Sequence, residues 1–204
     1  MEIEFKGANS VIIKSKNGTI VVDPTDNVKV KEVSNEGVIT IVTQDDFAPK
    51  NANFVINMPG EYEHNDISII GIPVQRHIDT EGKAGVAYRI SLNGVRIAIL
   101  GHVMAPIHDD DLESLGMVDI LIVPVGGGGY TLDAKDAASV ARQISPKVVI
   151  PTHYDDEGVK YEVPQESVDL FIKEIGGNFE EVDNLKLKNN ILPEALTVYK
   201  LKRK

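Results

Sequence analysis

Short runs of β-branched and aliphatic residues, separated by turn residues, fill the first half of the chain and restrict it to folds built on β-sheets. Two Asn-Gly pairs, Asn17-Gly18 and Asn93-Gly94, each join two such runs, which is a strong hairpin signal. The pattern predicts strands at residues 10–14, 19–22, 38–42, 53–57, 67–73, 85–92 and 95–100. The first half of the chain is therefore expected to be dominated by strands.

Helical patterns appear only in the second half. Three aspartates at 109–111 precede a short helix over 112–115, and Asp133 can cap a helix that continues to about Ile144. Apolar residues with helical spacing at 168, 171, 172 and 175 predict a further helix that starts at Pro164 and stops at Gly176-Gly177. Strands are predicted between and after these helices, at 119–125, 147–150 and 196–199.

This order of elements predicts one layered α/β domain that comprises residues 1–204. Strands and helices do not alternate regularly, which argues against a TIM barrel and against a doubly wound nucleotide-binding sheet. No linker, repeat or low-complexity tract divides the chain. The run of four glycines at 126–129 lacks the residues that complete a phosphate-binding loop, and it is interpreted as a turn.

Composition narrows the possible chemistry. The chain has no cysteine, which excludes disulfides, cysteine nucleophiles and thiolate metal sites, so any metal must be held by histidine nitrogen or by oxygen. The formal net charge of −10 opposes binding to nucleic acids and to acidic membrane surfaces. The N-terminal residues resemble no export signal, and no apolar run reaches about 18 residues. We therefore expect a cytoplasmic protein that contacts neither nucleic acid nor membrane.

Three of the five histidines follow predicted strands, where scaffolds often present functional groups. His77 follows the strand at 67–73, His102 follows the strand at 95–100, and His153 follows the strand at 147–150. A single histidine in this position is often only a surface residue or a hydrogen-bonded one. Three in the same context favour a shared cluster, although periodicity alone does not place them side by side.

Several segments, taken in order, resemble the metallo-β-lactamase fold superfamily, and in particular its small single-domain zinc-dependent hydrolase or lactonase-like branch. They are Ser10–Lys14 with Ile20–Pro24, Ile41–Thr43, Pro59–Glu63, Gly71–Pro73, Ile99–Gly101, Val118–Gly127 with Tyr130–Lys135, and Pro146–Tyr154. The resemblance implies an α/β (α+β) fold: a four-layer αβ/βα sandwich of two mixed β-sheets flanked by helices. The site would lie at one edge of the sheets.

The loop that carries the family's signature differs in this chain. The family has Thr-His-x-His-x-Asp-His after the strand that ends in Ile-Val-Thr, and these residues bind two zinc ions. Here Gln44 and Asp46 stand at the first two histidine positions, and Ala48 and Pro49 replace the Asp and the third His. Two later histidines match family ligands, namely His77 and His153, whereas His102 stands where the family has a metal-bridging aspartate.

The resemblance leads to two functional hypotheses. The first is a divergent metal-dependent hydrolase with a small-molecule substrate, of lactone or phosphorylated type. It would use one zinc ion, held by His77, His102 and His153 with Asp46 as an oxygen ligand, and Asp45 or Asp46 as the replacement base.

The second hypothesis is a catalytically inactive member that binds a ligand or a protein and holds no metal. Nuclease activity is disfavoured by the net charge and by the altered loop. Exposed strand edges favour a homodimer.

Overall fold

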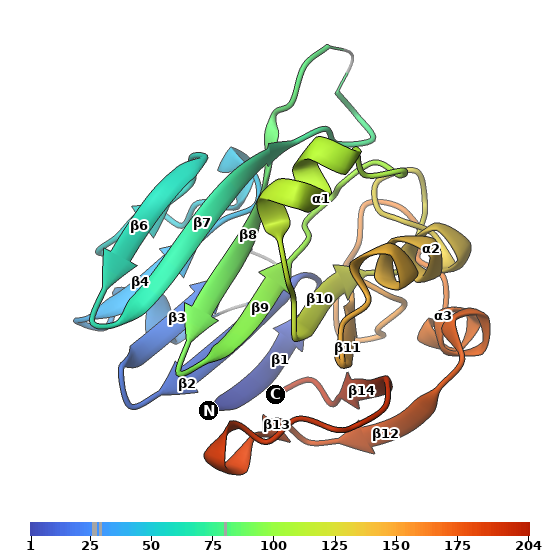
Figure 1. Cartoon of the computed structure of the whole chain (residues 1–204). Coiled ribbons are helices and arrows are strands. Elements are labelled where there is room, and N and C mark those ends of the chain that lie inside the picture. The colour runs from blue at the N-terminus through green and yellow to red at the C-terminus, as the bar shows by residue number, and fades with distance from the viewer. Residues whose placement is uncertain (26–27, 29, 80) are drawn as a thin grey trace.

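Two mixed β-sheets face each other in the computed structural model, which describes residues 1–25, 28, 30–79 and 81–204 (Figure 1). The six-stranded sheet has the order β13-β1-β2-β3-β4-β5, and the eight-stranded sheet has the order β12-β14-β11-β10-β9-β8-β7-β6. Parallel pairing joins β3 to β4 and β4 to β5 in the first sheet, and it joins β9, β10, β11, β14 and β12 in the second. The predicted sandwich of two mixed sheets is thereby confirmed.

The strands of the six-stranded sheet are β1 (Glu2–Gly7), β2 (Ser10–Ser15), β3 (Gly18–Val22), β4 (Val38–Ile41), β5 (Val55–Ile56) and β13 (Leu185–Lys186). Those of the eight-stranded sheet are β6 (Gly60–His64), β7 (Ile67–Val74), β8 (Gly85–Leu92), β9 (Val95–Ile99), β10 (Ile120–Pro124), β11 (Val148–Thr152), β12 (Asn178–Val182) and β14 (Thr197–Leu201). The Asn93-Gly94 hairpin joins β8 to β9, and both of its residues have positive φ, which is the backbone shape that such a turn requires.

Three α-helices flank the eight-stranded sheet: α1 (Asp109–Leu115), α2 (Ala134–Ile144) and α3 (Val168–Ile175). Helix α1 packs on β7, whereas α2 packs on β10 and on α3. Short 3-10 helices lie at Lys31–Ser34, Asp45–Phe47 and Lys188–Asn190. In the part of the chain that the structure describes, no helix is both long enough and apolar enough to cross a membrane.

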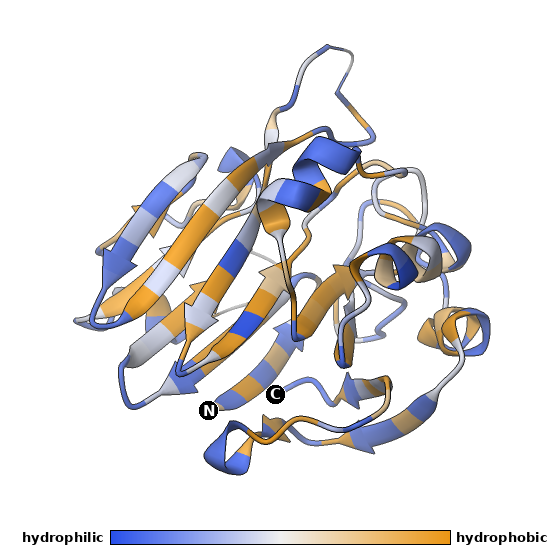
Figure 2. Cartoon of the chain, viewed as in Figure 1, coloured by the Kyte–Doolittle hydropathy of each residue, from blue (hydrophilic) through white to orange (hydrophobic). Residues whose placement is uncertain are grey.

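The apolar core lies mainly between the two sheets. Strand β10 is buried along its whole length, and Figure 2 shows it in the hydrophobic colour, as its continuous apolar run predicts. Main-chain bonds join the two sheets at one edge: the Val86 amide donates to the Thr43 carbonyl at 2.9 Å, and the His153 amide donates to the Ala8 carbonyl at 2.8 Å. These bonds fix the loops of the two sheets relative to each other.

One predicted boundary is wrong. Helix α3 begins at Val168 and not at Pro164, because the Ser167 side chain accepts the Asp169 amide at 3.2 Å and caps the helix there. The preceding segment is held in another way: the Glu166 amide donates to the Gly126 carbonyl at 2.8 Å. Residues 164–167 therefore pair with the loop after β10 instead of forming a first helical turn.

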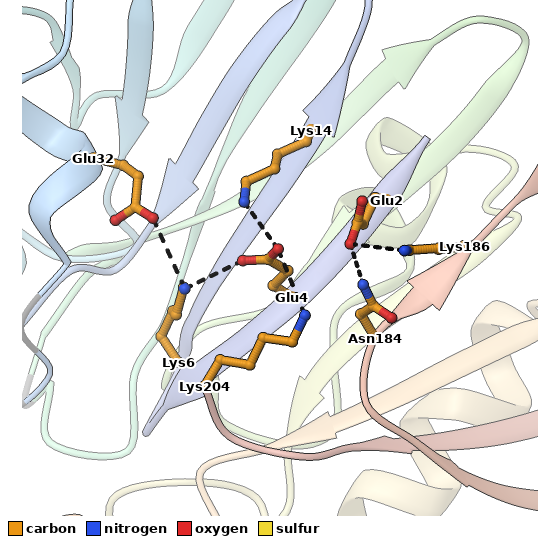
Figure 3. A network of polar contacts seen from close by, with 8 residues as sticks. All are labelled: Glu2, Glu4, Lys6, Lys14, Glu32, Asn184, Lys186 and Lys204. Carbon is orange, nitrogen blue, oxygen red and sulfur yellow. Dashed lines mark hydrogen bonds and ion pairs between the residues drawn. The ribbon is translucent and has the colours of Figure 1, made fainter.

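Ion pairs hold the C-terminus against the first strand (Figure 3). Glu4 of β1 is paired with Lys14 at 2.9 Å, with Lys6 at 3.2 Å and with Lys204 at 3.8 Å. Burial raises the pKa of Glu4, but hydrogen bonds and charges from Lys14 and Lys6 outweigh burial and hold the pKa below its ordinary value. The Lys204 amide also donates to the Phe5 carbonyl at 3.0 Å, so the last residue is fixed by main chain and side chain.

The cap of α2 gives a first testable expectation. The Asp133 side chain accepts the Asp136 amide at 2.8 Å, so Asp133→Ala leaves a helix N–H without a partner. We expect a loss of about 1 kcal/mol in the free energy of unfolding, measured by urea denaturation. Asp133→Asn keeps the acceptor and should retain most of the stability. An equal loss in both variants would contradict a capping role.

Candidate functional site

A cavity of about 780 Å³ lies where loops of the two sheets meet. The loops that line it follow β1, β3, β4, β7, β10 and β11, and His102 enters it from the loop after β9. Strand pairing brings the carboxyl ends of β9, β10 and β11 to the same edge, because these strands are parallel. This edge is where sheets of this type present functional side chains.

His102 and His153 are in contact in this cavity. Their ring centroids are 4.9 Å apart and their planes are nearly perpendicular, at 87°. Phe47 packs edge-on against the other side of His102, with centroids 5.4 Å apart, and Tyr161 packs against His153 at 4.9 Å. His153 has a φ of 49°, an uncommon backbone angle for a residue with a side chain, which turns it out of β11 into the cavity loop.

Both rings are neutral at physiological pH. Burial lowers the pKa of His102 to about 3, and the neighbouring His153, Arg76 and His77 also oppose a positive charge on its ring. Burial also lowers the pKa of His153, although the hydrogen bond to Gln165 opposes that shift. The His153 Nδ1 lies 3.0 Å from Gln165 Oε1, so the amide holds the ring in place, whereas the Nε2 of His102 is buried without a hydrogen-bond partner among the described residues.

His77 lies near the pair but does not join it. The loop after β7 is bridged to the loop after β9 through Arg76 and Val103, which brings His77 close enough for its charge to affect the pKa of His102. His77 is half-buried, its Nδ1 has no hydrogen-bond partner, and it is not among the residues that line the cavity. The structure therefore brings two of the three predicted histidines together and places the third beside them.

The two aspartates of the altered loop have separate surroundings. Asp46 is exposed and lines the cavity, together with Gln44, Phe47, Ala48 and Pro49. Asp45 is exposed outside the cavity lining, and its Oδ1 accepts a hydrogen bond from Asn57 at 3.0 Å. Of the two predicted bases, only Asp46 lies at the cavity.

Asn9, Tyr161 and Gln165 are among the cavity residues that were not predicted as site residues. Asn9 comes from the β1–β2 turn, and its Oδ1 accepts the Thr152 hydroxyl at 3.3 Å. Gln165 comes from the segment before α3. No sequence pattern predicts Asn9 or Gln165 as a site residue. Asn9 contacts Thr152 and Gln165 contacts His153 only because of the tertiary structure.

The donor set fits a divalent metal in part. Two imidazoles on one tetrahedral ion, each with a metal–nitrogen distance of about 2.0–2.1 Å, have ring centroids about 5 Å apart, which agrees with the observed pair. Metal binding also fits the Nε2 of His102, which has no partner among the described residues. It fits His153 as well, because Gln165 holds that ring in place through Nδ1. Within the described residues, however, no group of three or more His, Asp or Glu side chains is arranged to hold an ion. The pair could thus hold one ion, with other positions left to solvent or substrate.

The chain belongs to the β-lactamase superfamily: residues 2–153 match the family described as a beta-lactamase superfamily domain. The protein is similar over its whole length to a solved structure from Thermotoga maritima, a metallo-β-lactamase superfamily member whose assignment as a zinc-dependent hydrolase is itself inferred. The two are 26% identical with a TM-score of 0.80, and the match covers 98% of each chain.

Two curated relatives carry the name UPF0173 metal-dependent hydrolase. The one from Thermococcus onnurineus is 30% identical over 47% of this chain and 44% of its own length, so this match spans less than half of that relative. The one from Pyrococcus abyssi is 23% identical over 74% of this chain and 69% of its own length. The resemblance inferred from the sequence motifs is therefore confirmed at the level of the superfamily.

Proposed function

We propose that this protein is a metal-dependent hydrolase that acts on a small molecule in the cavity, with His102 and His153 holding a single divalent ion. The observation that carries the proposal is the buried contact between two neutral imidazoles at the carboxyl ends of β9 and β11. Neutral imidazole is the form that binds metals. The names of the relatives support the proposal, and zinc is the first ion to test.

The roles of the chain's own residues follow from their contacts. A divalent ion bound here would lower the pKa of a coordinated water and polarise a substrate carbonyl or phosphoryl group. Gln165 orients the ring of His153, and Phe47 shields one side of His102 from solvent. Asp46 is the predicted base that lies at the cavity and can accept a proton, whereas Asp45 is engaged by Asn57; Glu162 is a second carboxylate in the lining.

Metal binding can be measured without knowledge of the substrate. We expect purified protein that has been dialysed against Zn²⁺ to retain about one ion per chain, and its thermal stability to rise with metal concentration. At a hundred times the dissociation constant the gain is about 2.7 kcal/mol. Elemental analysis and differential scanning calorimetry give the two readouts.

Histidine variants test where the ion is held. His102→Ala and His153→Ala should each abolish the retained ion and the stabilisation, whereas the matched control His64→Ala should change neither, because His64 is exposed on β6. Retention of metal in both cavity variants would refute the assignment. Absence of binding and stabilisation in the wild-type protein with both Zn²⁺ and Mn²⁺ would refute the metal-dependent function itself.

A second candidate is a metal-free ligand-binding protein. The specific observation in its favour is that the described residues offer no third histidine or carboxylate in position to complete a metal site. Gln44 is neutral, and Ala48 and Pro49 have no donor atom in their side chains. This candidate predicts no metal-dependent change in stability, which is the outcome that refutes the first proposal.

A further inference from the structure

Two buried amide side chains at the base of the cavity have polar atoms without a partner. Asn9 is 4% exposed and Gln44 is 8% exposed, and both line the cavity. The Nδ2 of Asn9 and the Oε1 of Gln44 form no hydrogen bond with any residue that the structure describes. One side chain thus offers a donor, and the other offers an acceptor, in the cavity that His102 and His153 also line.

The turn that carries Asn9 is held by its contacts with the end of β11 and with the loop after it. The Oδ1 of Asn9 accepts the Thr152 hydroxyl, which leaves Nδ2 as the atom available to a ligand. The adjacent Ala8 has a φ of 48°, and its carbonyl accepts the His153 amide, so the turn is held against the cavity loop. A buried polar atom without a partner is costly, and a native structure retains such atoms mainly where something else pairs with them.

Charge at the cavity indicates what kind of molecule would provide these partners. The charged residues that line it are all exposed, and they balance: Asp46 and Glu162 against Lys50 and Lys160. None of the buried residues of the lining is an aspartate, a glutamate, a lysine or an arginine. The base of the cavity therefore favours an uncharged ligand over a carboxylate or an ammonium group, since an ion would lose its hydration without gaining a partner of opposite charge.

Aromatic rings define the shape of the space. Phe47, Tyr130 and Tyr161 line the same cavity as the two imidazoles. Flat rings of this kind favour planar ligands, because stacked and edge-on contacts contribute beyond the buried area.

We propose that this cavity binds an uncharged planar molecule that bears a primary carboxamide or an equivalent neighbouring donor and acceptor. The Asn9 amide donates to its oxygen, and the Gln44 amide oxygen accepts its N–H. This ligand assignment shares with the proposed function only the cavity in which both are placed. It requires no metal, so it can fail or hold independently of the metal assignment.

Benzamide is the probe, with benzoate as the charged analogue of the same shape. We expect benzamide to bind in EDTA with a dissociation constant on the order of millimolar, and benzoate to bind at least about ten-fold more weakly. Protein NMR titration gives the constants and shows whether the side-chain amide signals of Asn9 and Gln44 move. Repeating the titration in Zn²⁺ separates this binding from metal-dependent binding.

Substitutions test whether the side-chain amides of Asn9 and Gln44 bind benzamide. Gln44→Met keeps the length of the side chain but removes the acceptor, and Asn9→Leu removes the donor; each should weaken benzamide binding roughly ten-fold. Gln143→Met on the exposed face of α2 is the matched control and should change nothing. If Asn9→Leu does not fold, Gln44→Met alone is decisive. The assignment is overturned by equal binding of benzoate, by unchanged affinity in Gln44→Met, or by no benzamide-induced shift in the two amide signals.

Discussion

Replacing Asp23 with asparagine is expected to leave the free energy of unfolding nearly unchanged at pH 4 and to increase it by several kcal/mol at pH 8. Asp23 is fully buried at the end of β3, and burial raises its pKa from 3.8 to about 7, although hydrogen bonds from Thr43 act in the opposite direction. The shift corresponds to a stability difference on the order of 4 kcal/mol. Asparagine keeps the size of the side chain and avoids the buried charge.

The direction of the effect follows from proton binding. The folded pKa of Asp23 lies above its unfolded value, so between about pH 4 and pH 7 the folded protein binds a proton that the unfolded chain releases. Raising the pH through this range therefore costs the wild-type protein stability, and the loss is complete above the folded pKa. The local hydrogen bonds survive the substitution, because Thr43 donates to Asp23 through its amide and its hydroxyl, each at 2.7 Å, and the hydroxyl can instead accept from an asparagine.

Urea denaturation of the wild-type protein and Asp23→Asn across pH 4–8 measures the effect as a difference. Contributions from other carboxylates cancel in that difference. Asp119→Asn is the matched control, because hydrogen bonds from Arg96 lower the pKa of Asp119 below its ordinary value, so its contribution is lost only at more acidic pH and the difference from wild type should stay nearly constant between pH 4 and pH 8. A difference between wild type and Asp23→Asn that does not vary with pH would disprove the buried titration.

Replacing Gly126 with alanine is expected to destabilise the protein by about 3 kcal/mol, which lowers the melting temperature by roughly 6–12 °C. A Cβ at this position would overlap the main-chain carbonyl of His153 and would lie 2.5 Å from Gln165 Oε1. The carbonyl cannot move freely, because the His153 amide is bonded to Ala8. The substitution should therefore separate His153 from Gln165 and disturb the His102–His153 contact.

Calorimetry measures the effect of Gly126→Ala on stability, and NMR of the imidazole nitrogens reports on the position of the two histidine rings. Gly85→Ala is a suitable control, because an added Cβ there meets only side-chain atoms, the nearest being Arg76 Cγ at 2.9 Å, which can give way. Gly85→Ala should leave the imidazole signals of His153 in place. Unchanged stability and unchanged His153 signals in Gly126→Ala would show that the loop after β10 adapts without affecting the site.

Patterns of neighbouring residues predicted the buried strand, the hairpin turn and the helix cap, because each of these depends on interactions within a few residues. The run Ile-Leu-Ile-Val of β10 is buried as expected, the Asn93-Gly94 turn closes a hairpin, and Asp133 caps α2. Strands β1, β6, β12 and β13 were not predicted. For β1, the alternation of Glu2, Ile3, Glu4 and Phe5 carries the period of a half-buried strand and could have indicated it.

The arrangement of the candidate site could be predicted from the sequence less completely than the strands and helices, because it depends on tertiary structure. The sequence predicted that histidines follow strand ends, and it indicated which of them correspond to family ligands. It did not predict that His102 and His153 contact each other while His77 lies outside the cavity lining.

The sequence by itself determined the absence of thiol chemistry and predicted a layered α/β fold, because composition and periodicity are local properties. The departure of Gln44, Asp46, Ala48 and Pro49 from the ligand loop of the family stays a prediction that the resemblance implies. Only the tertiary structure decided that Asn9, Gln44 and Gln165 surround the histidine pair. Their positions depend on β9, β10 and β11 lying parallel and on the Ala8–His153 bond between the sheets. Contacts between residues more than a hundred positions apart are set by sheet order and packing, and no local pattern specifies them.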